Sequence, residues 1–166
     1  MVALKNKYWR FHLIWMMAQC ADTLHTFTLR NLSAKYPKVR TSFAHGGMLG
    51  AANQGRRVQG FESRPDIFKK LHNPRKMIGK KNLYFDTLVH DPHTLGLLKT
   101  RFGASQIIMG LDDPYPLGET ESTSGAYPGR ALDQAIQEGY IAEKEGVNIW
   151  HKNVLDWLGK KNEDFD

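Results

Sequence analysis

Hydrophobic positions along residues 8–36 recur at the spacing of an α-helix. Apolar side chains dominate from Phe11 to Met17. Further along, they follow a period close to 3.6 residues at Leu24, Phe27, Leu29 and Leu32. Pro37 ends this pattern, because the residue before a proline avoids the helical region of backbone space. The first part of the chain therefore predicts one long helix over residues 8–36.

Three runs of apolar and β-branched residues predict short strands at 38–44, 82–90 and 106–110. The last run is almost wholly apolar, as in a strand with both faces covered. Helices are expected at 91–101, where Asp91 caps the first turn, and at 130–144 and 148–159. The intervening stretches predict a loop or short helix at 46–64, irregular backbone at 66–81 and a long loop at 112–129.

Helices and strands alternate along the chain in this prediction. Such alternation indicates parallel βαβ units and an α/β fold. A parallel sheet of only three strands, buried on both faces, makes a poor independent domain. We expect the strand at 106–110 to be central in the sheet and the strand at 38–44 to present an open edge. Open apolar edges favour association into dimers or aggregates.

The composition is that of a globular protein folded as a single domain over residues 1–166. Hydrophobic residues make up 41% of the chain and charged residues 24%. No stretch approaches 18 uninterrupted apolar residues, and no apolar core ends in a leader-cleavage pattern, so we expect neither a membrane span nor a signal peptide. Cys20 is the one cysteine and cannot form an internal disulfide. Its solitary state favours a reducing, cytoplasmic location.

The net charge of +6 is unevenly distributed. Residues 1–101 hold 18 Lys and Arg against 5 Asp and Glu, whereas residues 102–166 hold 5 against 12. A basic half can indicate a nucleic-acid partner, but these residues are spread over many segments without a zinc-finger or RNP motif. We expect no nucleic-acid partner. A solvated face, or a place in a larger protein whose other part is acidic, explains the charge better.

Residues able to move protons or bind metals follow each predicted strand. His45 follows the first strand, Asp86 and His90 lie at the end of the second, and Asp112 follows the third. Ligands of parallel α/β folds bind beyond the carboxyl ends of the strands. A histidine and a carboxylate at neighbouring strand ends are typical of a metal-dependent or acid–base site. The alternative is that each is only a hydrogen-bonded loop residue.

Six segments of the chain form a co-linear set of motifs. They are Ser42–Gly47 (SFAHGG), Gly55-Arg56, Ser63–Asp66 (SRPD), Leu83–Pro92 (LYFDTLVHDP), Gly110–Glu119 (GLDDPYPLGE) and Lys152–Gly159 (KNVLDWLG). Their letters and spacing resemble the aminocarboxymuconate-semialdehyde decarboxylase family, a metal-dependent branch of the amidohydrolase superfamily. The resemblance covers about residues 10–160. It implies a partial (β/α)₈ TIM barrel, of which this chain is the C-terminal part with strands six to eight, since a complete barrel takes about 250 residues.

The resemblance also implies a role for each matching residue. His45 matches the family's catalytic histidine, which contacts the metal-bound water and moves protons. Asp112 matches the aspartate that ligates the divalent metal, usually zinc. Arg56 and Arg64 match arginines that bind substrate carboxylates, one of them in the neighbouring subunit's site, which implies a homodimer. Tyr115 falls where the family has an aromatic residue lining the pocket.

Other positions match less well. Trp15 resembles a substrate-binding tryptophan, with Trp9 as a rival and packing in the fold as the alternative for both. Asp113 is a candidate extra metal ligand, with a loop or capping role as the alternative. The family's His-x-His metal pair and a further ligand histidine lie on strands that this chain does not contain. Residues preceding Met1 would have to provide them.

Two remaining candidates are less favoured. His90 and His93 have a metal-like spacing, but Pro92 interrupts the helix that would present both rings on one face. Cys20 is expected to be a buried structural thiol rather than a nucleophile.

The favoured function is a C-terminal fragment of a metal-dependent carboxy-lyase that removes CO₂ from an acidic unsaturated semialdehyde or a related acid. Arg56 and Arg64 support a small acidic substrate, because forked guanidinium groups bind carboxylates. The alternatives are a metal-dependent hydrolase of the same superfamily and a non-catalytic remnant. Catalytic zinc takes about three protein ligands and Asp112 is only one, so we expect the chain alone to be inactive.

Overall fold

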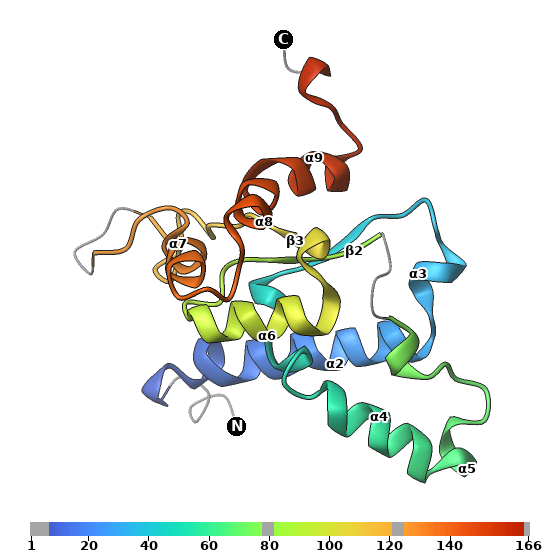
Figure 1. The fold of residues 1–166 in the computed structure, drawn as a ribbon. Helices are drawn as coiled ribbons and strands as arrows, with labels where there is room; N and C mark the ends of the chain where they lie inside the picture. Colours follow the sequence, from blue (N-terminus) through green and yellow to red (C-terminus); the bar gives the residue numbers. More distant parts are fainter. Residues whose placement is uncertain (1–6, 78–81, 121–124, 165–166) are drawn as a thin grey trace.

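A small parallel sheet organises the fold (Figure 1). The structure is a computed structural model that describes residues 7–77, 82–120 and 125–164. In these residues the strands are β1 (Thr41–Phe43), β2 (Leu83–Asp86) and β3 (Ile107–Ile108). Both strand pairs are parallel, with Phe43 beside Phe85 and Phe85 beside Ile107. The predicted α/β class is confirmed.

The central strand of the sheet is not the one that the sequence predicts. The strand order is β1-β2-β3, so β2 is central and the expectation for residues 106–110 is wrong. The outer edge of β3 is covered by a helical segment instead of a strand. The Met109 amide donates to the Ile149 carbonyl at 3.1 Å, and Asn153 Nδ2 donates to the Ile107 carbonyl at 2.8 Å. A wholly apolar run therefore indicates burial, not the number of neighbouring strands.

The second strand is shorter than predicted because a polar turn follows it. The Leu88 amide donates to the Asp86 carboxylate at 3.2 Å, and the Val89 amide donates to the Thr87 carbonyl at 2.8 Å. These local bonds replace the ladder that a strand over 82–90 would need.

The N-terminal helix is divided into pieces instead of running unbroken over residues 8–36. The pieces are η1 (Lys7–Trp9), η2 (Phe11–Trp15), α2 (Met16–Leu29) and α3 (Leu32–Lys35). Asn31 separates the last two with a φ of 50°. Asparagine is among the residues that adopt this left-handed conformation most readily, so the break is encoded locally and not by Pro37 alone.

The other helical elements connect and cover the strands. Between β1 and β2 lie η3 (His45–Gly50), α4 (Gln54–Ser63), α5 (Pro65–Phe68) and η4 (Pro74–Met77). Between β2 and β3 lie α6 (Pro92–Phe102) and η5 (Ala104–Gln106), and after β3 come α7 (Arg130–Gln137), α8 (Glu143–Val147), η6 (Asn148–Lys152), α9 (Asn153–Leu158) and η7 (Asn162–Asp164). Asp91 caps α6 as predicted, since its Oδ2 accepts from the Thr94 amide at 2.8 Å. The helix expected over 130–144 ends at Gln137, and the one over 148–159 is divided between η6 and α9.

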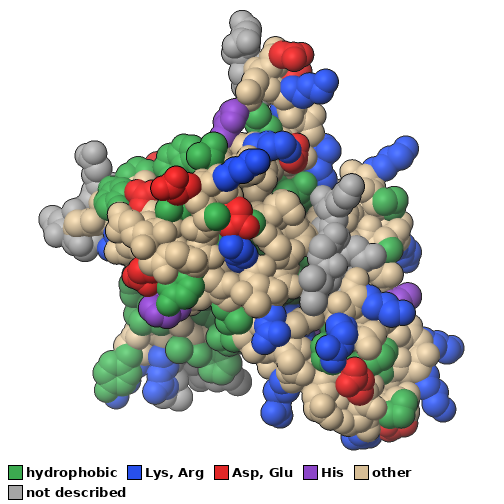
Figure 2. Space-filling view, viewed as in Figure 1, with side chains coloured by type: hydrophobic (Ala, Val, Ile, Leu, Met, Phe, Trp, Pro, Cys, Tyr) green, Lys and Arg blue, Asp and Glu red, His purple; other side chains and the backbone are tan. Residues whose placement is uncertain are grey.

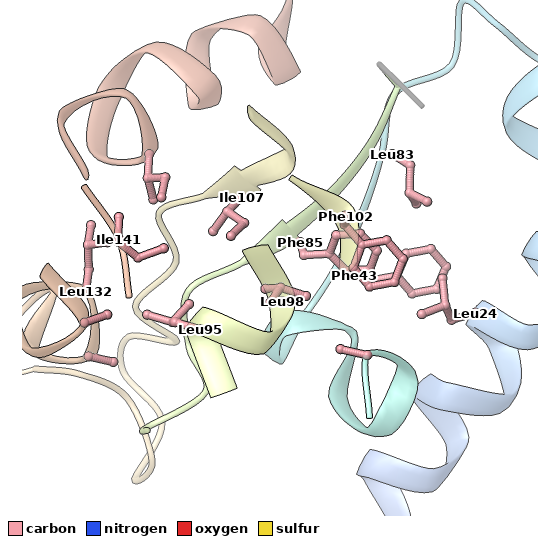
Figure 3. Close-up of a cluster of buried hydrophobic side chains, with 14 residues drawn as sticks. Leu24, Phe43, Leu83, Phe85, Leu95, Leu98, Phe102, Ile107, Leu132 and Ile141 are labelled. Atoms are coloured by element: carbon pink, nitrogen blue, oxygen red, sulfur yellow. The ribbon is translucent and has the colours of Figure 1, made fainter. Parts of the chain in front are cut away.

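Aromatic rings from the sheet and from α6 form the centre of the core (Figure 3). Phe85 of β2 is fully buried. Its ring centroid lies 4.3 Å from that of Phe102 and 6.1 Å from that of Phe43. Leu24 of α2 lies beside Phe43 in the same cluster (Figure 3). The core thus fixes the three strands against α2 and α6.

The uneven charge of the sequence is visible on the surface. In the face shown in Figure 2, Lys and Arg gather at the lower right, around α4 and α5, while Asp and Glu are prominent at the upper left, around α7 and α8. None of the helices in the described part of the chain is long and apolar enough to cross a membrane.

Candidate active site

A cavity of about 860 Å³ lies at the carboxyl ends of the three strands. His45 follows β1, His90 follows β2 and Asp112 follows β3, and all three line this cavity, which we call the strand-end cavity. Its remaining lining is mostly apolar and comes chiefly from Trp9, Leu13, Met16, Met17, Leu49, Leu88, Val89, Pro116 and Leu117. A few polar groups converging in a mainly apolar cavity are typical of a small-molecule site.

The same three residues share a rare backbone conformation. The φ angle is 53° at His45, 60° at His90 and 57° at Asp112. Non-glycine residues in this region carry local strain, and such strain clusters at functional sites. A strained residue that lines the strand-end cavity therefore follows each strand within four residues.

The turn after His45 requires two glycines. Gly46 and Gly47 also have positive φ angles, of 64° and 66°. A Cβ atom on Gly46 would lie 2.5 Å from Val89 Cγ1, and one on Gly47 would lie 2.8 Å from the Phe85 ring. The backbone can pass this close to β2 and to the turn after it only without side chains, which explains the two glycines after His45.

Asp86 fastens this turn to the central strand. Its Oδ1 atom accepts from the Gly46 amide at 2.9 Å and from the Leu88 amide at 3.2 Å. Burial raises the pKa of the Asp86 carboxyl, against the backbone N–H groups of His45, Gly46 and Leu88 and the charge of His45, which favour the ionised form. Asp86 therefore fixes the backbone of the turn that presents His45 to the cavity.

The loop after β3 holds Asp112 by backbone hydrogen bonds. The Tyr115 amide donates to the Asp112 carbonyl at 2.8 Å, and the Glu119 amide donates to the Leu111 carbonyl at 2.9 Å. Glu119 is buried, and its Oε1 accepts from the Ala131 amide in the first turn of α7 at 3.1 Å. The loop is thus closed on itself and tied to α7, which leaves the half-buried Asp112 side chain at the cavity.

His90 is suited to accept a proton at neutral pH. Partial burial lowers the pKa of its imidazole, and the positive charges of Arg130 and His45 lower it further, while Asp112 and Asp86 oppose them. A neutral imidazole beside a carboxylate can act as a general base. The sequence places Asp86 and His90 at a strand end as general candidates, and it indicates His90 with His93 only as a less favoured metal pair. Only the three-dimensional arrangement shows that one supports the His45 turn and the other lines the cavity.

The aromatic residues expected at the site are placed differently from one another. Tyr115 lines the strand-end cavity and is largely exposed. Trp9 lines it as well, whereas Trp15 is exposed on η2 and is not among the lining residues described. The tryptophan at the cavity is therefore Trp9.

The two arginines expected to bind carboxylates lie away from this cavity in the chain itself. Arg56, on α4, lines a separate cavity between α2 and α4. Arg64 is exposed and forms two hydrogen bonds with Asp66, at 3.0 Å from Nε and 2.8 Å from Nη2. The structure thus brings together His45, Asp112 and Tyr115 but neither arginine.

The minor candidates are separate from the cavity. Asp113 is exposed and His93 lies against the Tyr140 ring at 5.0 Å, so neither adds to the lining described here. The Cys20 thiol is half-buried, and its pKa is raised by burial and by the charge of Asp86. A raised pKa disfavours the thiolate and supports the structural interpretation of Cys20.

The described residues of this chain do not form a complete metal site. Among residues 7–77, 82–120 and 125–164, no group of three or more His, Cys, Asp or Glu side chains is arranged to hold a metal ion. Asp112 contributes one carboxylate to the cavity, whereas zinc sites in enzymes take about three protein ligands. A metal bound here would need ligands from elsewhere.

Two curated proteins resemble the chain closely in sequence. The chain is 32% identical over 155 residues to 2-amino-3-carboxymuconate-6-semialdehyde decarboxylase of Dictyostelium discoideum. The matched region covers 92% of this chain and 40% of that protein. It is 37% identical over 118 residues to the protein of the same name from Caenorhabditis elegans. That match covers 70% of this chain and 29% of the relative. The chain therefore spans less than half the length of the relatives it matches. No protein-family model matches it.

Solved structures share its fold at low sequence identity. The 4-oxalomesaconate hydratase of Rhodopseudomonas palustris superposes with a TM-score of 0.69 at 14% identity, over 92% of this chain and 44% of that one. IDCase of Metarhizium anisopliae superposes with a TM-score of 0.67 at 16% identity, over 86% of this chain and 40% of that one. The 5-carboxyvanillate decarboxylase of Sphingomonas paucimobilis superposes with a TM-score of 0.60 at 15% identity, over 83% of this chain and 39% of that one.

The chain thus shares its α/β fold with these decarboxylase and hydratase structures. The resemblance predicted from the motifs is confirmed, because the chain is similar in sequence to two proteins named 2-amino-3-carboxymuconate-6-semialdehyde decarboxylase.

Proposed function

We propose that these residues form part of a metal-dependent carboxy-lyase that releases CO₂ from 2-amino-3-carboxymuconate-6-semialdehyde or a related small unsaturated acid. The observation that carries the proposal is the convergence of His45, His90 and Asp112 on one mainly apolar cavity. The names of the two curated relatives support the reaction. The match to less than half of each relative supports the view that the chain corresponds to part of a barrel, with strands six to eight as its strands.

Decarboxylation needs a proton at the carbon that loses CO₂. When the carbon–carboxylate bond breaks, its electron pair remains on the substrate carbon, and that carbon then takes a proton. We assign this proton to His45, which lines the cavity and whose turn is held by the hydrogen bond between Gly46 and Asp86. His45 then needs a new proton. Because the pKa of His90 is lowered, a proton that His90 takes from solvent is readily passed on, and its transfer to His45 restores the donor.

The cavity wall also favours loss of charge. Its lining is mainly apolar, which disfavours a carboxylate relative to the neutral CO₂ that it becomes. Asp112 is the residue we propose as a ligand of the divalent metal, zinc, with the other ligands outside the described residues. When bound, such an ion would polarise groups that it contacts.

Arg56 and Arg64 enter the proposal through a second subunit. Both are exposed and neither lines the strand-end cavity of its own chain. Their resemblance to carboxylate-binding arginines therefore supports a homodimer in which α4 and the start of α5 reach the partner's cavity. The lone cysteine, Cys20, supports a reducing, cytoplasmic setting.

The test uses a complete barrel. The chain is co-expressed with the part of the Dictyostelium discoideum relative that the match leaves out, and CO₂ release and zinc content are measured. His45→Ala should abolish turnover and keep the metal, whereas Asp112→Ala should lose both.

Arg56→Ala and Arg64→Ala should each weaken substrate binding by about ten- to a hundredfold, the effect of one lost charge-assisted contact. Arg75→Ala is the matched control, because Arg75 is an exposed arginine paired with Glu62 at 3.5 Å. Unchanged kinetics in both test variants would remove the support for an acidic substrate. A His45→Ala enzyme with normal turnover would refute the assignment of the proton donor.

A further inference from the structure

A second cavity, of about 420 Å³, lies between α2 and α4. We call it the helix cavity. Its α2 side has small residues, Ala18 and Ala21, with Asp22 and His25, and its other side has Arg56 and Arg57 among others. Leu49 is the one residue that lines both cavities as described, so the polar groups of the helix cavity are separate from His45 and Asp112.

Arg57 is buried in the wall of this cavity with most of its donors unused. Its side chain is only 7% exposed. Nη2 donates to the Gly50 carbonyl at 2.6 Å and to Gln54 Oε1 at 2.5 Å. Nε and Nη1 are shielded from solvent and have no hydrogen-bond partner in the described part of the chain. A guanidinium has five N–H groups, so three of them remain unsatisfied here.

No carboxylate described in the structure compensates this buried charge. Burial lowers the pKa of Arg57 to about 10, with no opposing contribution from an acidic group. Leaving a charged donor buried and unpaired is strongly unfavourable, and buried charges in folded proteins are normally paired. Arg57 therefore lacks an anionic partner.

His25 adds a second unsatisfied group to the same cavity. Its Nδ1 atom is buried and has no partner among the described residues. Its pKa is lowered by burial and then by the charge of Arg57, whereas Asp22 on the same helix opposes the shift. The influence of Arg57 on His25 shows that the two side chains act on one region of the cavity.

We propose that the helix cavity binds a small monocarboxylate, whose carboxylate oxygens accept hydrogen bonds from Arg57 and His25. One guanidinium matches the single charge of a carboxylate and can bind it through two N–H groups. The volume leaves ample room for a ligand of a few carbon atoms, with Ala18, Ala21 and Phe68 as apolar contacts. Arg56 lines this cavity and also enters the proposed function, but Arg57 and His25 have no role there and do not line the strand-end cavity.

The test titrates the chain with butyrate, and with butyramide as a neutral molecule of similar shape. Binding is followed by calorimetry and by the NMR signal of the Arg57 side-chain Nε–H. We expect butyrate to bind and to shift that signal, and butyramide to do neither. Butyrate should also raise the melting temperature, since a ligand that binds the folded state stabilises it.

Variants then locate the site. Arg57→Gln should weaken butyrate binding by about tenfold or more, because it removes the positive charge and the forked pair of N–H groups. His25→Ala should weaken it by a smaller factor, because it removes one neutral donor. Arg75→Gln, at an exposed arginine outside the cavity, should bind butyrate like the wild type. Equal binding of butyrate and butyramide by the wild-type chain would overturn the proposal even if Arg57→Gln fails to fold. So would undiminished butyrate binding by a folded Arg57→Gln variant. The readout is binding, so its outcome is independent of CO₂ release.

Discussion

Replacing Asp86 should release the turn that carries His45. In Asp86→Ala, the amides of Gly46 and Leu88 lose the Oδ1 acceptor that they reach at 2.9 and 3.2 Å. Each buried N–H left without a partner costs about 1–3 kcal/mol. The buried carboxylate itself is unfavourable, as its raised pKa shows, and its removal offsets part of that loss. We expect a net loss of unfolding free energy of about 2–4 kcal/mol.

Asp86→Asn keeps the hydrogen-bond acceptor but removes the negative charge, so it tests the two separately. Its amide oxygen can still accept from the two amides, so the expected loss at neutral pH is smaller, about 1 kcal/mol. The difference should depend on pH. Because the folded-state pKa of Asp86 is raised, the folded protein binds the proton more tightly than the unfolded chain does. Wild type should therefore gain stability relative to Asp86→Asn as the pH falls from neutral through that raised pKa.

Urea denaturation followed by tryptophan fluorescence measures these free energies. Asp156→Ala is the matched control, because Asp156 is exposed and forms an ion pair with Lys152, one helical turn away, at 2.6 Å. Its expected loss is at most about 0.5 kcal/mol. The reasoning is refuted if Asp86→Ala is no more destabilised than Asp156→Ala, or if Asp86→Asn loses as much as Asp86→Ala.

Two further changes test how the fold is held. Gly47→Ala should destabilise the chain by about 1–3 kcal/mol, because the new Cβ would lie 2.8 Å from the Phe85 ring at a φ of 66°. Gly55→Ala, in helix α4 with open space around it, should instead leave stability unchanged or raise it. Thermal melts measure both variants, and equal destabilisation by Gly47→Ala and Gly55→Ala would contradict this account. Glu145→Gln should lower stability at neutral pH by about 1 kcal/mol, because Glu145 accepts from Lys99 at 2.6 Å and from the Ala142 amide at 2.9 Å. The Glu145 pKa is lowered, so wild type should lose this advantage as the pH falls through the folded-state pKa, and a difference that persists in acid would count against the pair.

The sequence predicts the class of fold but not the arrangement within the sheet. Alternation of helix and strand suffices for parallel βαβ units, since the chemistry of each run is local. The place of β3 at an edge depends on Asn153 and Ile149, which cover it from more than 40 residues further along the chain. The hydrophobic pattern of a strand does not reveal such a distant partner. The sequence therefore predicts that the strand at 106–110 is central, whereas β2 is.

The candidate site divides in the same way. His45 and Asp112 can be found from the sequence because each follows a predicted strand closely and the strands are parallel. The supporting role of Asp86 cannot, because it depends on how closely the Gly46 backbone approaches β2. The choice of Trp9 over Trp15 depends on the break of the N-terminal helix, which periodicity alone does not reveal.

The most direct test of the proposed function is release of CO₂ by the completed barrel. The chain, co-expressed with the remaining part of the Dictyostelium discoideum relative, is incubated with 2-amino-3-carboxymuconate-6-semialdehyde, and CO₂ is measured beside the chain alone. We predict one CO₂ for each substrate consumed by the wild-type complex, none by the chain alone, and none by the complex with His45→Ala. A zinc-containing complex that consumes amide or lactone substrates by hydrolysis and releases no CO₂ would contradict the decarboxylase assignment.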